Sequence, residues 1–301
     1  MTTTYANLVD EVLLNLSGYT LRQDRITHLT QDVTNVGLLL NLGNTTNIGK
    51  GVVEIEDELL WLDNYDRVSS TATVAPYGRG YHGTTKVAHT TNTKVTISPT
   101  FPRATVKKAI NDTIDAVFPN LFAVGVHTFT YNAVKTTYSL PAETETILYV
   151  SYKPTGPTEE WLPLRNYRAD AFANATSFTT TQSISIYDRI EAGRTVQVYY
   201  TKKPTTLLAA ASTDVFETVT GLPSSCKDVI LYGASYRLAS FIDPGRLNYS
   251  SAEADQADTK IQYGSGASTT RFLLALYQQR LNEETKKLRG VYPTRIHYTR
   301  Y

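Results

Sequence analysis

The sequence has 301 residues, 41% of them hydrophobic, which is enough for the packed cores of one to three domains. Its 29 Lys and Arg balance 28 Asp and Glu, so a dedicated nucleic-acid binder is disfavoured. A lone cysteine excludes a framework of intrachain disulfides and suits assembly in a reducing cytosol. No apolar run approaches the ~20 residues of a membrane span, and the start of the chain lacks the pattern of a signal peptide, so we expect no membrane partner and no secretion.

The first expected element is a short amphipathic helix. Leu8, Val12 and Leu16 recur at helical spacing behind a run of threonines that can cap a helix. Gly18 follows as a stop signal. From Val36 to Pro99 the apolar runs become short and are separated by Asn, Gly, Ser and Pro, which predicts a small β-module.

A second helix is expected between two β regions. Pro102 suits the start of a helix, and the apolar residues that follow share one face until Pro119 ends the pattern. Six short apolar runs then lie between Val124 and Lys203, at a spacing that predicts a sandwich or a partly open barrel.

The C-terminal quarter has a helical pattern. A segment that is apolar nearly all round runs from the Pro223 region to Ile242, which indicates a buried helix. Gly264 and Gly266 predict a break, because each glycine costs ~1 kcal/mol inside a helix. A final helix is expected from about Thr269 to Arg289.

These elements predict an α+β fold with a helical core of N-terminal, middle and C-terminal helices and two inserted β-rich modules, the second sandwich- or barrel-like. The expected division of the chain is an N-terminal helix and linker (1–35), a small β-module (36–100), a core helix (101–122), a β-sandwich-like module (123–222), and C-terminal helices with an extended tail (223–301).

Two glycine-rich segments resemble nucleotide-binding motifs without their context. Gly78, Gly80 and Gly83 match G-x-G-x-x-G, but a strand-like run follows where a helix is required. The segment from Gly43 to Lys50 has the wrong spacing for a phosphate-binding loop, and Gly51 replaces the Ser or Thr that holds magnesium. We therefore expect no cofactor.

No catalytic or metal-binding pattern stands out. The five histidines show no metal-ligand spacing, and G-x-S-x-G is absent. Glu159 and Glu160 beside Trp161 could serve glycoside hydrolysis or sugar stacking, although a solvated strand edge is the commoner explanation. The sequence therefore predicts that the protein is not an enzyme.

Charge is strongly segregated within residues 52–111. Residues 52–66 contain acidic side chains but no Lys or Arg, and residues 67–111 contain Lys and Arg but no acidic side chain. Two solvated faces would explain this pattern; so would a head-to-tail interface in a ring, where one edge complements the other. The residues predicted at that interface are Glu54, Glu56, Asp57, Glu58, Arg67, Arg79, Lys86 and Lys94.

The last residues, KKLRGVYPTRIHYTRY, are basic and aromatic and contain no acid. Pro293 prevents a simple continuation of the preceding helix. This tail is either a frayed terminus or a docking peptide whose Tyr and Arg side chains make strong contacts.

In order and pattern, the chain resembles the head-to-tail connector (adaptor) proteins of tailed bacteriophages. The segments that carry the resemblance are VVEIEDELLWL, GRGYHGTTKVAH, FPR with the helix AINDTIDAVFPNLF, EAGRTVQVYY, YGASYRLA and LNEETKKLRGVYP. The inserted β regions depart from the compact helical adaptors, so an adjacent neck or tail component is an alternative.

The resemblance implies a structural subunit of the virion neck, assembled in the host bacterial cytoplasm. It implies a homo-oligomeric ring of twelve copies that binds the portal protein and a downstream neck or tail protein, and that passes DNA through its lumen without specific binding. Family adaptors often grip the portal with an extended C-terminus, which here would contain Tyr292, Arg295, Ile296, Tyr298, Arg300 and Tyr301.

The alternative function is a carbohydrate- or receptor-binding virion or tail protein. It would explain the β-module rich in Thr and Tyr, and it predicts an exposed aromatic platform around Trp161.

Overall fold

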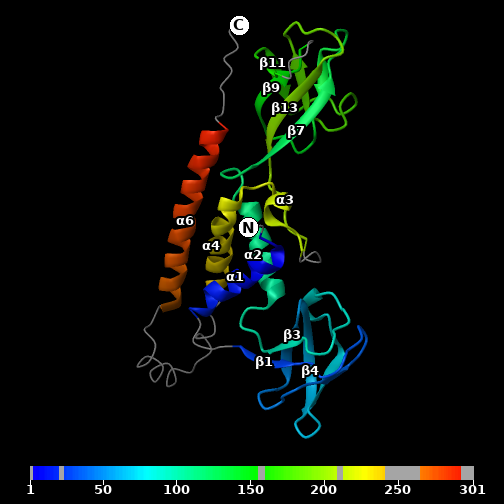
Figure 1. The fold of residues 1–301 in the computed structure, drawn as a ribbon, viewed down its shortest axis with the longest axis vertical. Helices are drawn as coiled ribbons and strands as arrows, with labels where there is room; N and C mark the ends of the chain where they lie inside the picture. Colours follow the sequence, from blue (N-terminus) through cyan, green and yellow to red (C-terminus); the bar gives the residue numbers. More distant parts are fainter. Residues whose placement is uncertain (1–2, 20–23, 155–159, 209–212, 241–264, 293–301) are drawn as a thin grey trace.

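The computed structural model describes residues 3–19, 24–154, 160–208, 213–240 and 265–292, and Figure 1 shows their arrangement. The helices lie in the middle of an elongated molecule, and a β-sheet body lies at each end (Figure 1). We call these the first β-body, the helical cluster and the second β-body. None of the described helices has both the length and the apolar character of a membrane span.

The first β-body is one six-stranded sheet in the order β1-β6-β3-β4-β5-β2, with antiparallel neighbours. Its strands bury a separate hydrophobic core that includes Leu40, Ile55 and Leu62. Glu56 and Asp57 form the two-residue turn between β3 and β4, and Glu56 has a φ of 54°. The strands are β1 (Arg25–His28), β2 (Leu39–Asn41), β3 (Gly51–Ile55), β4 (Glu58–Asp66), β5 (Thr71–Arg79) and β6 (Lys94–Ile97).

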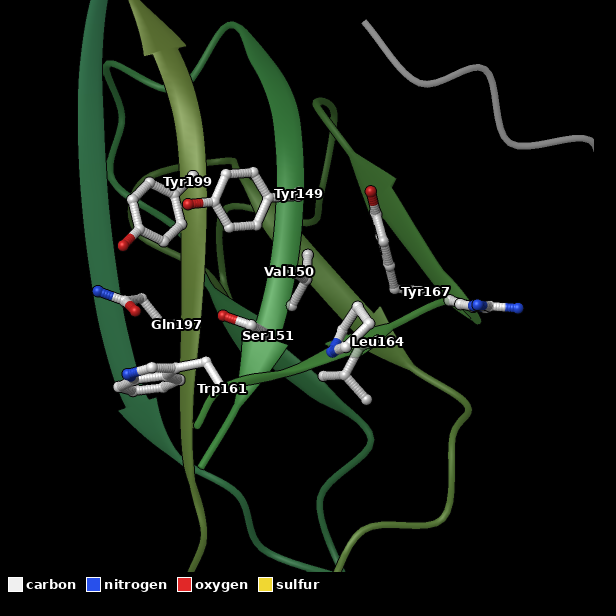
Figure 2. Close-up of a pocket in the computed structure, with 10 residues that line it drawn as sticks. Tyr149, Val150, Ser151, Trp161, Leu164, Tyr167, Gln197 and Tyr199 are labelled. Atoms are coloured by element: carbon white, nitrogen blue, oxygen red, sulfur yellow. The ribbon is translucent and has the colours of Figure 1, made fainter. Parts of the chain in front are cut away.

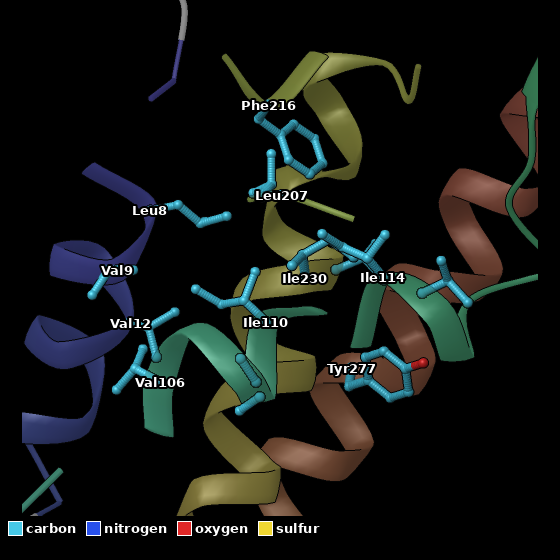
Figure 3. Close-up of a cluster of buried hydrophobic side chains, with 14 of the residues drawn as sticks. Leu8, Val9, Val12, Val106, Ile110, Ile114, Leu207, Phe216, Ile230 and Tyr277 are labelled. Atoms are coloured by element: carbon cyan, nitrogen blue, oxygen red, sulfur yellow. The ribbon is translucent and has the colours of Figure 1, made fainter. Parts of the chain in front are cut away.

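The helical cluster buries a second core, in which α4 packs against the other long helices (Figure 3). The Thr4 side chain caps α1 by accepting from the Asn7 backbone N–H at 3.3 Å, as Thr residues commonly do. Gly233 lets α4 approach α2 closely, since a Cβ at this position would lie 2.3 Å from Thr113 Cγ2. The α-helices are α1 (Tyr5–Ser17), α2 (Arg103–Ala116), α3 (Phe216–Thr220), α4 (Lys227–Ala239) and α6 (Ser265–Val291).

The second β-body consists of two sheets over a third core. One sheet has the order β10-β9-β13-β7 and the other the order β11-β12-β8, and Val150, Val198 and Ile184 lie in the core they share. The strands are β7 (Ala123–Thr130), β8 (Thr137–Ser139), β9 (Thr146–Tyr152), β10 (Leu162–Leu164), β11 (Tyr167–Asp170), β12 (Ser183–Ile186) and β13 (Thr195–Lys202). Two single turns of 3₁₀ helix, η1 (Tyr81–Gly83) and η2 (Ser224–Cys226), complete the described elements.

The predicted fold class, an α+β fold organised on a helical core, was wrong. Within the described residues, strands dominate: three sheets of six, four and three strands stand beside five α-helices, one of which has only five residues. Each β-body buries its own hydrophobic core, so neither is an insertion that depends on a central helical core. The many Thr, Tyr and Val residues favour such half-buried strands.

The predicted helix boundaries also need adjustment. The last helix begins at Ser265, so Gly266 lies inside it and not at a break. The described part of the preceding helix ends at Ala239, and Gly264 lies outside the described residues.

Candidate functional site

Three features of the surface and interior bear on function: a buried ionic network in the first β-body, a second ionic cluster between that body and the helices, and an aromatic hollow on the second β-body.

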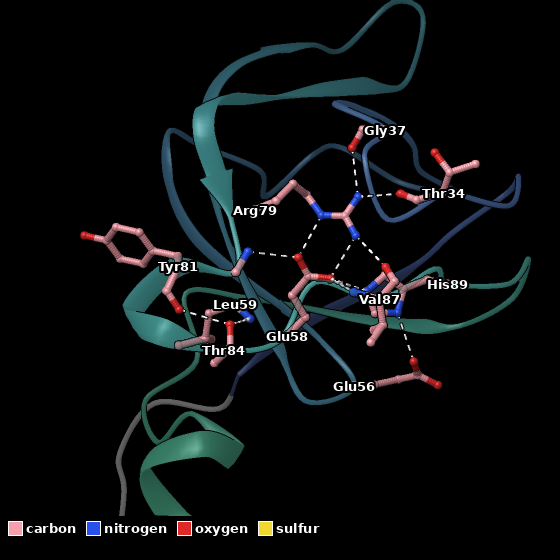
Figure 4. A network of polar contacts seen from close by, with 11 residues as sticks. Thr34, Gly37, Glu56, Glu58, Leu59, Arg79, Tyr81, Thr84, Val87 and His89 are labelled. Carbon is pink, nitrogen blue, oxygen red and sulfur yellow. Dashed lines mark hydrogen bonds and ion pairs between the residues drawn. The ribbon is translucent and has the colours of Figure 1, made fainter. Parts of the chain in front are cut away.

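The buried network is centred on the Glu58 carboxylate at the start of β4 (Figure 4). Arg79 at the end of β5 donates from Nε to Oε1 at 2.7 Å and from Nη2 to Oε2 at 2.8 Å. Both side chains are almost completely buried, and the fork geometry makes this a strong, specific pair.

The Arg79 guanidinium also binds three loop carbonyls. It donates to Thr34 O at 2.7 Å, to Gly37 O at 2.8 Å and to Val87 O at 2.6 Å. A single side chain therefore fixes the loop before β2 and the segment after η1 to the centre of the sheet.

His89 completes the network from the segment before β6. Its Nδ1 lies 2.9 Å from Glu56 Oε2, and its Nε2 lies 2.9 Å from Glu58 Oε2. Because both ring nitrogens face carboxylate oxygens, the arrangement fits the doubly protonated imidazolium. Burial lowers the pKa of His89, but the hydrogen bonds to Glu58 and Glu56 raise it more, and the net shift is upward.

The same contacts hold Glu58 ionised. Burial alone would raise its pKa, yet the hydrogen bonds from Arg79, His89 and the backbone lower the pKa to about 2. One of those backbone donors is the N–H of Gly80, at 3.0 Å from Oε1. The glycine-rich loop thus directs a backbone donor at a carboxylate of its own chain.

A second ionic cluster joins the first β-body to the helices. Arg103, the first residue of α2, donates its backbone N–H to Glu54 Oε1 at 2.5 Å. Asp57 accepts from Arg103 Nε at 3.3 Å and from Lys107 Nζ at 2.7 Å, while Arg103 also pairs with Asp10 of α1. Burial raises the pKa of Glu54 to about 7 despite the Arg103 contacts.

The residues predicted at a subunit interface therefore divide into two groups. Glu58 and Arg79 are buried against each other inside one chain, and Glu54 and Asp57 bind α2 of the same chain. The β-hairpin and α2 bring the acidic and basic segments together within one subunit, which one-dimensional charge spacing could not reveal. The predicted residues that remain exposed are Glu56, Arg67, Lys86 and Lys94.

The aromatic hollow lies on the outer face of the four-stranded sheet, and Figure 2 shows it. Tyr149 of β9 and Tyr199 of β13 are paired in register, and their rings stack with centroids 4.2 Å apart. Gln197, Ser151 and Trp161 continue the lining of a cavity of about 320 Å³. The alternative function predicts an exposed aromatic platform around Trp161, and this residue is 38% exposed.

The predicted portal-binding tail is described only at its start. Tyr292 lies where α6 ends, packs against the helical cluster, and lines a hollow of about 330 Å³ with Leu288 and Phe122. The other residues predicted for this role, Arg295, Ile296, Tyr298, Arg300 and Tyr301, lie outside the described residues.

Residues 84–282 match the SU10 adaptor protein family, and this range is more than half of the chain. The chain belongs to the SU10 adaptor protein family. No curated protein sequence matches it.

The SU10 adaptor family indicates a structural adaptor role in a bacteriophage and a place in the virion. The matched range contains α2, the second β-body, α4 and most of α6. It leaves out α1 and the first five strands of the first β-body. The aromatic hollow lies within the SU10 adaptor match, whereas most of the buried ionic network lies before it.

Proposed function

We propose that the protein is a head-to-tail adaptor of the phage neck: its copies form a ring that docks on the portal and continues the DNA channel towards the tail. The match of residues 84–282 to the SU10 adaptor family carries this proposal. We further propose a ring of twelve copies with a downstream neck or tail protein as its second partner, assembled in the host cytoplasm. The work of such a subunit is assembly and not turnover.

The elongated arrangement supports this role. Adaptors must bridge two structures, and here two β-bodies extend from a helical cluster in opposite directions (Figure 1). Ring assembly would multiply the individually modest contacts of each subunit into a stable attachment. DNA would pass through the lumen without base-specific contacts.

The portal contact can be tested through the tail. Removing residues 293–301 leaves all three described cores in place, so the truncated subunit should fold with an unchanged melting temperature. We expect it to lose co-purification with heads that carry the portal. A matched control exchanges the order of the same nine residues and keeps their composition. Truncated protein that still binds heads would refute the proposed contact.

The aromatic hollow supports a second candidate function, carbohydrate or receptor binding by a virion protein. Stacked tyrosines and Trp161 beside Gln197 form a concave mixture of aromatic and polar groups, which is the usual character of a small-ligand site. Binding of an oligosaccharide that Trp161→Ala abolishes would favour this function over a purely structural one.

A further inference from the structure

The four-stranded sheet of the second β-body has one covered face and one open face. Val150, Val196 and Val198 point into the core shared with the three-stranded sheet. The alternate residues of β9 and β13 form the opposite face, as strand geometry requires. On that face Tyr149 is 37% exposed, so its ring is accessible to a partner.

The open face carries a row of side chains, Tyr149, Tyr199, Ser151, Gln197 and Trp161, which we call the track. Strand register pairs Tyr199 with Tyr149, and two residues farther along it pairs Gln197 with Ser151. Trp161 lies before β10 and lines the same hollow (Figure 2). Ser151 Oγ is buried and has no hydrogen-bond partner among the described residues. The track therefore offers stacked rings followed by polar groups.

The C-terminal end of α6 reaches the start of this track. Tyr292 donates its backbone N–H to Leu288 O at 2.9 Å, so the helical hydrogen bonding continues to this residue. Tyr292 lines a hollow together with Val124 of β7, two residues from Val126, which strand register pairs with Tyr199. Figure 1 shows α6 pointing towards the second β-body.

Nine residues follow Tyr292, and their length and chemistry fit the track. An extended chain advances ~3.3 Å per residue, so nine residues span about 30 Å, more than the few residues of strand between Tyr149 and the level of Trp161. The sequence PTRIHYTRY carries two arginines and two tyrosines and no acid. Arg stacks favourably on the faces of Tyr and Trp, and the exposed Glu160 beside Trp161 complements its charge.

We propose that residues 293–301 dock on the Tyr149–Trp161 face of the second β-body of their own subunit. The tail stays on this face until another contact replaces it. Because the tail and its site belong to one chain, the effective concentration is in the millimolar range, and even weak contacts are occupied. The proposal stands whether or not the portal is the partner that later receives the tail.

Trp161 can report this docking directly. The chain has two tryptophans, so Trp61→Phe leaves Trp161 as the only one, and the peptide PTRIHYTRY contains none. In this background we expect truncation after Tyr292 to red-shift Trp161 emission and to increase its quenching by acrylamide. The free peptide should restore protection of the truncated protein, and a scrambled peptide should not.

Variants of this face distinguish specific docking of the tail from a general change in the second β-body. In the full chain, Tyr149→Ala removes one stacked ring, and Gln197→Lys places a like charge beside the basic tail without deleting packing; both should lose the protection. Val134→Ala, at an exposed apolar residue in the loop between β7 and β8, is the matched control and should retain it.

Three results would overturn the proposal. Quenching that truncation leaves unchanged would show that the tail does not cover Trp161. Protection that appears only at high protein concentration would assign the site to a second copy. If oligosaccharides protected Trp161 from acrylamide to the same extent in the full and the truncated chains, the site would be assigned to a glycan. Loss of head binding by the truncated protein tests the portal contact separately and affects none of these readouts.

Discussion

At the scale of single residues, Glu54 is an acid held in an environment that disfavours its charge. Only 6% of the residue is exposed, and its carboxylate accepts from the Arg103 backbone N–H. Its pKa rises from 4.5 to about 7, chiefly through burial. Between these two values the folded state binds more protons than the unfolded state, so the stability that this group contributes falls as pH rises from 4.5 to 7.

Glu54→Gln should remove that loss, because the amide oxygen still accepts from Arg103 and carries no charge. We expect the variant to match the wild type at pH 4 and to exceed it at pH 8 by up to about 3 kcal/mol in free energy of unfolding. Urea unfolding followed by Trp61 fluorescence, with Trp161 replaced by Phe, measures this. Equal stability of the two proteins at pH 8 would show that burial does not penalise the charge.

Glu58 behaves in the opposite sense. Its folded pKa of about 2 lies below the unfolded value, so its contribution is present above pH 4.5 and is lost as pH falls towards 2. Glu58→Gln leaves Arg79 buried without its counter-charge and should destabilise the first β-body by about 3–5 kcal/mol at pH 7. Lys94→Ala, at an exposed position of the same body, should change stability by less than about 0.5 kcal/mol. A small effect of Glu58→Gln in thermal unfolding would contradict the role of the pair.

The contacts of His89 could not be predicted from the sequence. Its place in the histidine spacing gave no sign of the contacts it makes. Glu58 lies 21 residues before Arg79 and 31 residues before His89 in the sequence, and only the fold of the first β-body brings them into contact. Charge segregation was visible in the sequence, but its pairing within the chain depends on the fold.

At the scale of elements, the close approach of α4 to α2 rests on Gly233. A Cβ there would meet Thr113 Cγ2 at 2.3 Å and the Tyr277 ring at 3.0 Å. The site is therefore overpacked by any side chain, even though alanine favours a helix more than glycine does.

Gly233→Ala should lower the free energy of unfolding by about 1–3 kcal/mol, and adding Thr113→Ser should recover part of the loss because it removes Cγ2. Gly290→Ala is the matched control: nothing lies within 4 Å of its Cβ position, and the change should be neutral or stabilising by up to about 1 kcal/mol. Thermal melts of the four proteins check this. A Gly233→Ala protein as stable as the wild type would mean that the helices can move apart without cost.

The elements differ in how far local pattern predicted them. The helix at Tyr5–Ser17 follows directly from Leu8, Val12 and Leu16, and all three side chains are buried. The strands were visible as short apolar runs, but their pairing, such as β6 between β1 and β3, links distant segments and has no local signal. Fold class was wrong for that reason: the pairing gave each set of strands a core of its own.

At the scale of the whole molecule, the charges left exposed on the first β-body are the remaining candidates for a ring interface. We propose that Arg67, Lys86 and Lys94 face acidic groups of a neighbouring subunit. Changing all three to Glu should weaken ring formation more at low salt than at high salt, because exposed charges are screened over ~10 Å at 0.1 M. Sedimentation at two salt concentrations measures this. If the variant formed rings as readily as the wild type at low salt, the interface would have to lie elsewhere.

The central claim is that copies of this chain assemble as a ring on the portal. Native mass spectrometry of the full-length protein mixed with isolated portal rings tests it most directly, since mass gives the stoichiometry of both partners. We expect a complex in which a closed set of this chain, twelve copies, is bound to one portal ring. A monomer whose mass is unchanged by the portal would contradict the proposed function.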